Sequence, residues 1–254
     1  MLFLKSIQDF IQTKFPISKV IPLVGGGTNL LYLLKNSECQ SVIKIAIISN
    51  DNTRIELECL SMLKESLLTP DLYDSFYIDG RLALHMEYIQ GNTFLNEILD
   101  MYKNNDYEGI YPLFRSLGYL LGKLHKQNYK TKDAIPVIEP IIDYKSFIES
   151  RLYEQLIELV SYLKSIKKHE VLLHGDYGYH NVIMQKSGTY RIIDWELAGY
   201  GDPRIDIGNV LLWTHLHFSE IAEVCVNNFI EAYLTTNDSS VHQILCILLS
   251  LFRY

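Results

Sequence analysis

The sequence predicts an α+β protein with a small β-rich N-terminal part and a larger, mainly helical C-terminal part. Up to about residue 88, short runs rich in Ile, Leu, Val and Tyr are bounded by turn residues, which is typical of strands. After Gly91, apolar residues recur at helical spacing. The chain has 254 residues, 48% of them hydrophobic, which is enough to build two lobes around real cores. We therefore expect one lobe over residues 1–90 and a second over residues 91–254, joined near residues 87–91.

The N-terminal part is expected to contain several strands and one helix. The strand-like runs are LYLL (31–34), SVIKIAII (41–48) and LALHMEYI (82–89). The helix is expected over residues 53–68, where apolar side chains fall at helical spacing: Ile55, Cys59, Met62 and Leu63. The first fifteen residues alternate between apolar and polar and lack a small-residue cleavage site, so we expect no signal peptide.

The C-terminal part is expected to consist of helices with short strands inserted between them. One helix is indicated by an apolar stripe formed by Leu113, Leu117, Leu120, Leu121 and Leu124, and a second by a similar repeat within residues 144–167. Three short β-like runs follow: VLLHG (171–175), NVIMQ (181–185) and YRIID (190–194). The last fifty residues again look helical. Their apolar run Ile244–Phe252 is about half of the ~20 residues that a membrane-spanning helix needs, so we expect no membrane association.

The formal net charge of −7 comes from 30 acidic and 23 basic side chains. Because nucleic acid backbones are bound by Lys and Arg, this charge argues against a nucleic acid partner and favours a cationic or metal-bridged one. The four cysteines lie far apart without any Cys-x-x-Cys pair, which argues against a zinc ribbon and against a disulfide framework. Reduced thiols fit a cytoplasmic location, which we expect for this chain.

The densest group of polar residues lies between residues 171 and 209. It contains four aspartates and two histidines among apolar, strand-like runs. If Ser187 and Gly188 form a two-residue hairpin turn, Asn181 lies directly opposite Asp194, at ~4.5–5.5 Å. An amide carbonyl and a carboxylate held side by side are hard oxygen ligands, which suit Mg²⁺ carrying phosphates.

Asp176 lies five residues before Asn181, in a loop leading to the same strand end. It can reach the same volume without being a metal ligand, as a base for an incoming hydroxyl must. Two other interpretations stay open from the residues alone. A purely structural polar network leaves the concentration of oxygen ligands unexplained. A metallohydrolase built on His174, Asp176, His180 and Asp194 lacks the second cluster of His and Asp residues that such a site needs.

Three motifs in this segment have fixed spacings: HGD-x₄-N (174–181), IDWE (193–196) and LAGYGDPRIDIGN (197–209). Together they resemble the catalytic core of the aminoglycoside phosphotransferases and their small-molecule kinase relatives, which share a bilobal protein-kinase-like fold. The resemblance covers residues 20–235. It implies an enzyme that uses Mg²⁺ and ATP (or GTP) to phosphorylate a hydroxyl of a small molecule. It implies that Asp176 is the catalytic base and that Asn181 and Asp194 are the metal ligands.

Other polar residues near this segment are expected to support the site rather than to act in it. His174 is expected to brace the catalytic loop by hydrogen bonding, and His180 to fill surface or core while pointing away from Asn181. The resemblance implies that Asp206 holds the catalytic loop through backbone N–H groups. His125 ends a helix that matches the family's L-x-x-LH pattern and is expected to cap or to pack.

A phosphate cradle is expected where Gly25, Gly26 and Gly27 lie between two strand-like runs, because bare backbone N–H groups can approach phosphates there. Three glycines in a row also form ordinary hairpin turns, so the motif is a weak signal when taken alone. Lys44 stands in mid-strand, in the place of the family's phosphate-contacting lysine. The alternative for Lys44 is a lysine that keeps an edge strand soluble.

Such a lysine needs a carboxylate to orient it, and the neighbouring helix offers Glu56 and Glu58. The family's E-x₃-L-x₂-L pattern fits Glu56, Leu60 and Leu63. We therefore expect Glu56 to pair with Lys44 and keep Glu58 as the alternative.

The run LHMEYIQGNTF (84–94) resembles the hinge that follows the last strand of the small lobe. Adenine is expected to bond backbone groups from Glu87 to Ile89, with Met86 lining its pocket. The resemblance thus implies a nucleotide-binding lobe over 1–90 and a catalytic and substrate-binding lobe over 91–254.

The acceptor molecule is not indicated by the sequence. Negative charge would suit a cationic aminoglycoside, and choline/ethanolamine-type or sugar kinases of the same fold are the alternatives. A catalytically inactive nucleotide-binding protein is another alternative, although every expected catalytic position is filled. A protein kinase fits poorly, because eleven residues between Asp194 and Asp206 leave no room for the usual activation segment. The oligomeric state and the choice between ATP and GTP stay open.

Overall fold

The N-terminal part of the fold is a five-stranded antiparallel sheet with the strand order β1-β2-β3-β5-β4. The computed structural model describes residues 2–23, 29–127, 129, 135–138 and 170–236. The strands are β1 (Lys19–Leu23), β2 (Asn29–Lys35), β3 (Gln40–Ala46), β4 (Leu72–Ile78) and β5 (Arg81–Glu87). β3 lies at the centre of this sheet, and five of its seven residues are buried.

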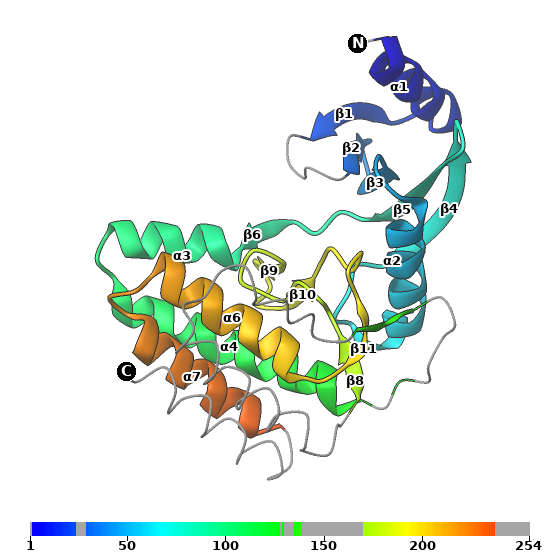
Figure 1. The fold of residues 1–254 in the computed structure, drawn as a ribbon. Helices are drawn as coiled ribbons and strands as arrows, with labels where there is room; N and C mark the ends of the chain where they lie inside the picture. The colour runs from blue at the N-terminus through cyan, green and yellow to red at the C-terminus, as the bar shows by residue number, and fades with distance from the viewer. Residues whose placement is uncertain (1, 24–28, 128, 130–134, 139–169, 237–254) are drawn as a thin grey trace, which may run out of the picture.

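The first residues of the chain form a helix, α1 (Leu2–Lys14), where the sequence shows an alternation of apolar and polar residues. The alternation did not predict a helix, but Ile7 and Ile11 are four residues apart and therefore share one helical face. Both are fully buried, in a small core with Ile43 and Ile45 of β3. α1 thus covers one face of the sheet, at the upper end of the molecule in Figure 1.

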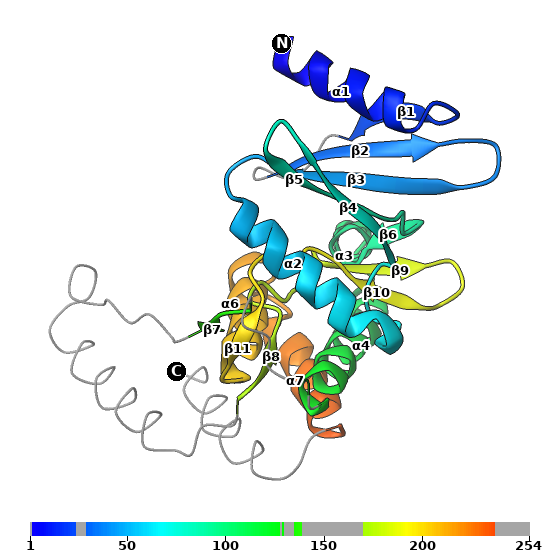
Figure 2. The ribbon, with the colours of Figure 1, turned by 90° about the vertical axis from the view of Figure 1, so that its right-hand side faces the viewer.

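The second helix, α2 (Asn50–Leu63), begins three residues earlier than the apolar pattern predicts. Ser49 precedes it and accepts a hydrogen bond from the Asp51 N–H, which satisfies one free donor of the first turn. A short 3₁₀ turn (Lys64–Ser66) follows, and Leu67 ends the helical segment with a φ of 57°. α2 lies between the sheet and the C-terminal part of the chain (Figure 2).

The C-terminal part is mainly helical, as predicted, and carries two three-stranded sheets. Its described helices are α3 (Phe94–Lys103), α4 (Tyr107–Lys126), α6 (Arg204–His217) and α7 (Ala222–Leu234). One sheet has the order β10-β9-β6, with β6 (Gly91–Thr93), β9 (Val182–Gln185) and β10 (Tyr190–Ile192). The other has the order β7-β11-β8, with β7 (Val137–Ile138), β8 (Val171–Leu173) and β11 (Gly199–Gly201). The predicted α+β class is confirmed.

A single large hydrophobic core joins α2 and β5 to the C-terminal helices. It includes Leu60, Leu84 and Trp195, which come from three separate regions of the sequence. A backbone hydrogen bond of 2.6 Å from the Ile192 N–H at the end of β10 to the Leu68 carbonyl also links the two parts of the chain. This core holds the ends of β8, β9 and β10 at a fixed position beside α2. The division of the chain at residue 90 stays a prediction.

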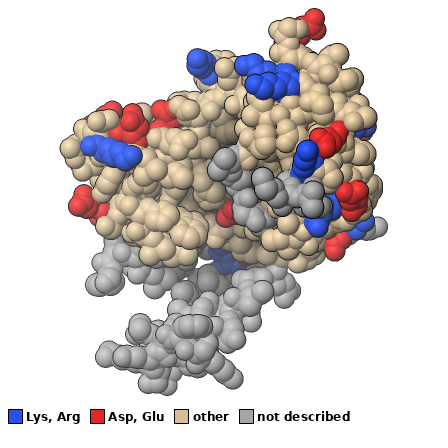
Figure 3. Space-filling model, turned by 90° about the horizontal axis from the view of Figure 1, so that it is seen from above, with Lys and Arg blue, Asp and Glu red and all other residues tan. Residues whose placement is uncertain are grey.

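Three segments singled out in the sequence lie outside the described residues: the glycines at 25–27, the expected helix at 144–167 and the apolar run at 244–252. Among the described helices, none combines the length and the hydropathy needed to cross a membrane. Figure 3 shows one face of the molecule, on which Lys and Arg side chains are scattered among Asp and Glu. The described part of this face therefore has no continuous basic strip for a polyanion to follow.

Candidate active site

The hairpin of β9 and β10 has a register one residue away from the predicted one. Val182 pairs with Ile192, and the Ile193 N–H donates to the Asn181 carbonyl at 2.9 Å. The reason is the loop, which has three residues instead of two: the Gln185 N–H bonds the Thr189 carbonyl, and Gly188 takes a φ of 81°. The prediction that Asn181 lies directly opposite Asp194 was therefore wrong.

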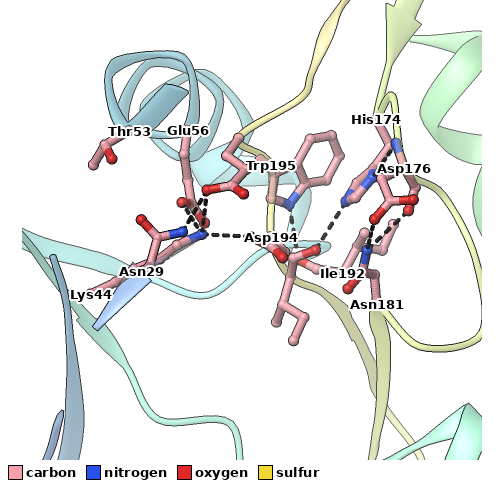
Figure 4. A network of polar contacts seen from close by, with 12 residues as sticks. Asn29, Lys44, Thr53, Glu56, His174, Asp176, Asn181, Ile192, Asp194 and Trp195 are labelled. Carbon is pink, nitrogen blue, oxygen red and sulfur yellow. Dashed lines mark hydrogen bonds and ion pairs between the residues drawn. The ribbon is translucent and has the colours of Figure 1, made fainter. Parts of the chain in front are cut away.

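Asp194 reaches the site by a backbone reversal beyond the end of β10. Its φ is 68°, in the left-handed region that residues other than glycine rarely adopt. The next residue, Trp195, is fully buried and donates its indole N–H to the Ile192 carbonyl at 2.9 Å. The Trp195 ring thus anchors the turn, while the Asp194 side chain stays 41% exposed and bonds Lys44 (Figure 4).

His174 links the loop after β8 to the segment that carries Asp194. Its Nε2 lies 2.9 Å from the Ile193 carbonyl oxygen, and its Nδ1 lies 3.3 Å from the Asp176 backbone nitrogen. Because a carbonyl only accepts and an N–H only donates, His174 carries its proton on Nε2. Burial lowers the pKa of His174, which keeps this ring neutral. The predicted bracing by His174 is present in the structure.

Asp206, at the start of α6, holds the backbone of the same loop. It is fully buried and accepts the backbone N–H groups of His174 at 2.8 Å and of Gly175 at 2.9 Å. His125 Nε2 lies 3.2 Å from Asp206 Oδ2, and the other ring nitrogen of His125 bonds the Tyr233 hydroxyl at 3.0 Å. These contacts agree with the structural roles expected of Asp206 and His125.

Asp176 and Asn181 face each other across the loop between β8 and β9. The Asn181 amide nitrogen donates to the Asp176 carbonyl oxygen at 2.9 Å and to Asp176 Oδ2 at 3.2 Å. His180 does not fill surface or core as expected: its Nε2 lies 3.2 Å from the same Oδ2 atom. The hydrogen bond from His180 lowers the pKa of Asp176 against the opposing effect of burial. Asp176 therefore stays a carboxylate.

Lys44 is buried in mid-strand and surrounded by carboxylates. Its Nζ lies 2.5 Å from Glu56 Oε2 and 2.5 Å from Asp194 Oδ1. Burial alone would lower the pKa of Lys44, but the charges of Glu56 and Asp194 outweigh it and raise the pKa above its ordinary value. Lys44 therefore stays charged and connects α2 with the segment after β10. The expected pairing with Glu56 rather than Glu58 is the one found in the structure.

Two further residues of this network were given no role from the sequence. Glu196 lies 3.7 Å from Lys44 Nζ, and the Asn29 amide nitrogen donates to Glu196 Oε2 at 2.6 Å. Both Asn29 and Glu196 are buried. Glu196 could have been suspected as the last residue of the IDWE motif, but its contact with Asn29 joins residues 167 positions apart and has no local signal.

The oxygen atoms in this network fit a magnesium ion. Since the amide nitrogen of Asn181 is used by Asp176, the carbonyl oxygen of Asn181 is the atom left for a cation. One carboxylate oxygen from each of Glu56, Asp194 and Glu196 lies within 4.8 Å of the others, but the Lys44 ammonium already pairs with these three carboxylates. Carboxylate and amide oxygens are the ligands that Mg²⁺ prefers, so the donor atoms of Asn181 and Asp194 fit this ion.

The residues expected around adenine lie at the end of β5 and in the segment leading to β6. Met86 and Ile89 are buried. The Glu87 N–H donates to the Asp71 carbonyl at 2.8 Å, and the Asp71 N–H donates to Glu87 Oε2 at 3.2 Å. The Glu87 N–H is thus already satisfied by the protein, which leaves Tyr88 and Ile89 as better backbone donors for a ligand.

Comparison with known proteins shows which proteins this chain resembles. The profile of the "Phosphotransferase enzyme family" matches residues 19–243 of this chain. Hygromycin-B 4-O-kinase of Escherichia coli is 26% identical over 66 residues, which are 26% of this chain and 19% of that enzyme. The match thus spans about a fifth of the length of this curated relative.

Solved structures share the fold at low sequence identity. Choline kinase LicA from Streptococcus pneumoniae superposes with a TM-score of 0.62 at 20% identity, over 90% of this chain and 80% of that chain. A thermostable mutant of aminoglycoside phosphotransferase APH(4)-Ia, solved in ternary complex with AMP-PNP and hygromycin B, gives a TM-score of 0.54 at 13% identity, over 89% and 88% of the two chains. These likenesses confirm the fold implied by the sequence resemblance.

Proposed function

The chain belongs to the phosphotransferase enzyme family, and from this premise we propose that it transfers the γ-phosphoryl group of ATP to a hydroxyl group of a small molecule. The observation that carries the proposal is the position of Lys44, a buried cation held between Glu56 and Asp194. Phosphoryl transfer needs fixed positive charge and oxygen ligands beside a base, and the network in Figure 4 supplies these groups together.

Lys44 and the glycines at 25–27 are the groups proposed to hold the phosphates. Lys44 keeps its charge in a buried position, where its attraction to a phosphate oxygen is stronger than in water. Glu56 fixes the direction of the ammonium group from α2. The glycine segment lies between β1 and β2 in the sequence, and β2 pairs with β3, which carries Lys44, so its backbone N–H groups are proposed to assist Lys44.

Asn181 and Asp194 are the residues proposed to hold Mg²⁺. When bound, the ion would neutralise charge on the phosphate oxygens as the phosphoryl group leaves ADP. Asp194 is held by the turn at Trp195, and Asn181 by its amide bonds to Asp176. Both ligands are therefore oriented by the protein before nucleotide arrives, which reduces the reorganisation needed during transfer.

Asp176 is proposed as the catalytic base. Its carboxylate is 39% exposed, so an acceptor hydroxyl can reach it from solvent. His174 holds the Asp176 backbone, and Asp206 holds the two residues before it. Such a carboxylate can accept a hydrogen bond from the acceptor hydroxyl, orient its oxygen towards the γ-phosphorus and take its proton during transfer.

Adenine is proposed to bind at the segment after β5, through backbone groups from Glu87 to Ile89, with Met86 lining the pocket. Since the Glu87 N–H is bonded to Asp71, the contribution of Glu87 is its carbonyl oxygen. Residues 1–90 then form the nucleotide-binding lobe and residues 91–254 the catalytic lobe.

The acceptor is proposed to be a small molecule with a free hydroxyl, and the net charge of −7 favours a cationic one. One similar structure is a choline kinase and another holds hygromycin B. Choline and hygromycin B are cationic alcohols and therefore the first compounds to test. Sugars and ethanolamine form the second group. ATP is the proposed donor, and GTP is the alternative that belongs in the same test.

The test is a screen in which the protein is incubated with γ-labelled ATP or GTP, Mg²⁺ and a panel of amino-alcohols, sugars and aminoglycosides. Acceptor-dependent transfer that disappears in Asp194→Ala and on chelation of Mg²⁺ supports the proposal. Tight nucleotide binding without transfer to any acceptor would favour the alternative of an inactive nucleotide-binding protein.

A further inference from the structure

His180 contacts Asp176 at a place where the sequence indicated no role for it. His180 Nε2 lies 3.2 Å from Asp176 Oδ2, and the Asn181 amide nitrogen lies 3.2 Å from the same atom. An ionised carboxylate only accepts hydrogen bonds, so the proton of His180 is on Nε2 in this contact. Two donors therefore meet one oxygen of Asp176. Its other oxygen, Oδ1, makes no hydrogen bond to the part of the chain that the structure describes.

The loop is shaped to bring the His180 ring back over Asp176. The Asn181 N–H donates to the Gly178 carbonyl at 3.0 Å, which closes a tight turn with His180 in its second half. A Cβ atom at position 178 would lie 2.8 Å from His180 Cε1 and 2.9 Å from its Nδ1. A side chain at position 178 would therefore displace the imidazole from this place.

Tyr179 also contacts the His180 ring. The rings of Tyr179 and His180 meet edge to face, with centroids 6.1 Å apart. Tyr179 is itself buried, its hydroxyl lies 2.8 Å from His217 Nδ1, and its carbonyl accepts the Leu95 N–H at 2.8 Å. Tyr179 thus offers His180 a fixed surface, although His180 is a third exposed and could otherwise turn into solvent.

We propose that His180 is a positioning residue for the base: with Asn181 it holds Asp176 Oδ2 and thereby presents Oδ1 to the acceptor hydroxyl. This inference rests on the proposed function. In the step that it describes, the acceptor O–H bond breaks and the proton goes to Asp176 Oδ1. The acceptor oxygen forms a bond to the γ-phosphorus, and the bond from that phosphorus to the oxygen of ADP breaks, leaving its electron pair on ADP.

Three variants separate positioning from a merely structural role. His180→Leu removes the donor and is expected to lower kcat about tenfold, the value of one charge-assisted hydrogen bond in a partly exposed site, with little change in the KM for ATP. His180→Gln places an amide nitrogen near the position of Nε2 and is expected to recover most of the loss. Gly178→Ala keeps the histidine but displaces its ring, so its kcat should fall towards that of His180→Leu.

His215→Leu is the control, because the ring of His215 bonds the Leu211 carbonyl on α6. Thermal unfolding is measured for every variant, so that a loss of fold is not mistaken for a loss of positioning. If His180→Leu and Gly178→Ala keep the wild-type kcat, the inference is overturned. If His180→Gln is as slow as His180→Leu, the ring acts through packing and the inference is likewise overturned.

A spectroscopic readout is independent of turnover. The ¹⁵N shifts of the His180 ring are expected to show the proton on Nε2 in the wild-type protein and to change in Asp176→Ala. Identical shifts in both proteins would refute the contact even if the enzyme is active. Conversely, if the expected shifts are found but no acceptor is phosphorylated by the wild type, the proposed function fails while the arrangement of His180 and Asp176 stands.

Discussion

Replacing Asp206 with alanine is expected to destabilise the protein strongly, although the residue does not touch the proposed substrates. Asp206 is fully buried and accepts the backbone N–H groups of His174 and Gly175. A buried donor left without an acceptor costs about 1–3 kcal/mol, so the two donors together predict a loss of about 2–6 kcal/mol in the free energy of unfolding. This is a large part of the about 5–15 kcal/mol that stabilises a typical domain.

The assay is urea unfolding followed by circular dichroism, with Asp106→Ala as the matched control. Asp106 also accepts one backbone N–H, from Gly109, but at the exposed start of α4, where a lost cap costs about 1 kcal/mol. If Asp206→Ala does not fold, Asp206→Asn, which keeps one acceptor oxygen, is measured in its place and should lose an intermediate amount. A loss for Asp206 no larger than that of the control would refute the reasoning.

Three further variants or treatments test other parts of the structure. Lys44→Met should abolish tight nucleotide binding in calorimetry and lower stability by about 3–5 kcal/mol, because it leaves the buried Glu56 carboxylate unpaired. The double variant with Glu56→Gln should recover stability but not binding, and recovered binding would contradict the role of Lys44. Asp194→Ala should make the affinity for AMP-PNP independent of Mg²⁺, and a retained Mg²⁺ dependence would place the metal site elsewhere. Alkylation of the native protein at pH 8 should modify the exposed Cys39 and spare Cys59, whose pKa burial raises from 9.0 to about 12; equal modification of both would show that Cys59 is not buried.

The parts of the site that depend on short, fixed spacings could be predicted from the sequence. Glu56 was identified because its position relative to Leu60 and Leu63 matches the E-x₃-L-x₂-L pattern of the family that the sequence resembles. His174 and Asp206 were likewise assigned their supporting roles correctly. For Glu56 and Asp206 the assignment came from motifs that match the family's pattern.

The register of the β9–β10 hairpin could not be predicted in the same way. The four residues 186–189 are compatible with a two-residue loop and with a three-residue loop that has Gly188 in the left-handed region. The two loops differ by one residue in register, and one residue decides whether Asn181 faces Asp194 or Ile193. The direction of the Asp194 side chain is then set by the left-handed backbone at Asp194 instead of by strand pairing.

Contacts between distant segments were not accessible from the sequence at all. The bond between Asn29 and Glu196 forms only after the sheet and the segment behind β10 have packed together. The contact of His180 with Asp176 is helped by Gly178, because a Cβ atom at position 178 would lie within 3 Å of the His180 ring in the folded loop. Such contacts follow from tertiary packing, for which one sequence carries no periodic signal.

Mass spectrometry of the acceptor tests most directly whether this chain moves a phosphoryl group to a hydroxyl with Asp176 as the base. An acceptor found in the screen is incubated with ATP whose γ-phosphoryl oxygens are isotopically heavy, and with either the wild-type protein or Asp176→Asn. We predict that the wild type yields an acceptor carrying the heavy phosphoryl group, and that Asp176→Asn forms it about 10²–10⁴ times more slowly with nearly unchanged ATP affinity. Equal rates for the two proteins, or loss of ATP affinity as the only effect of Asp176→Asn, would contradict the account.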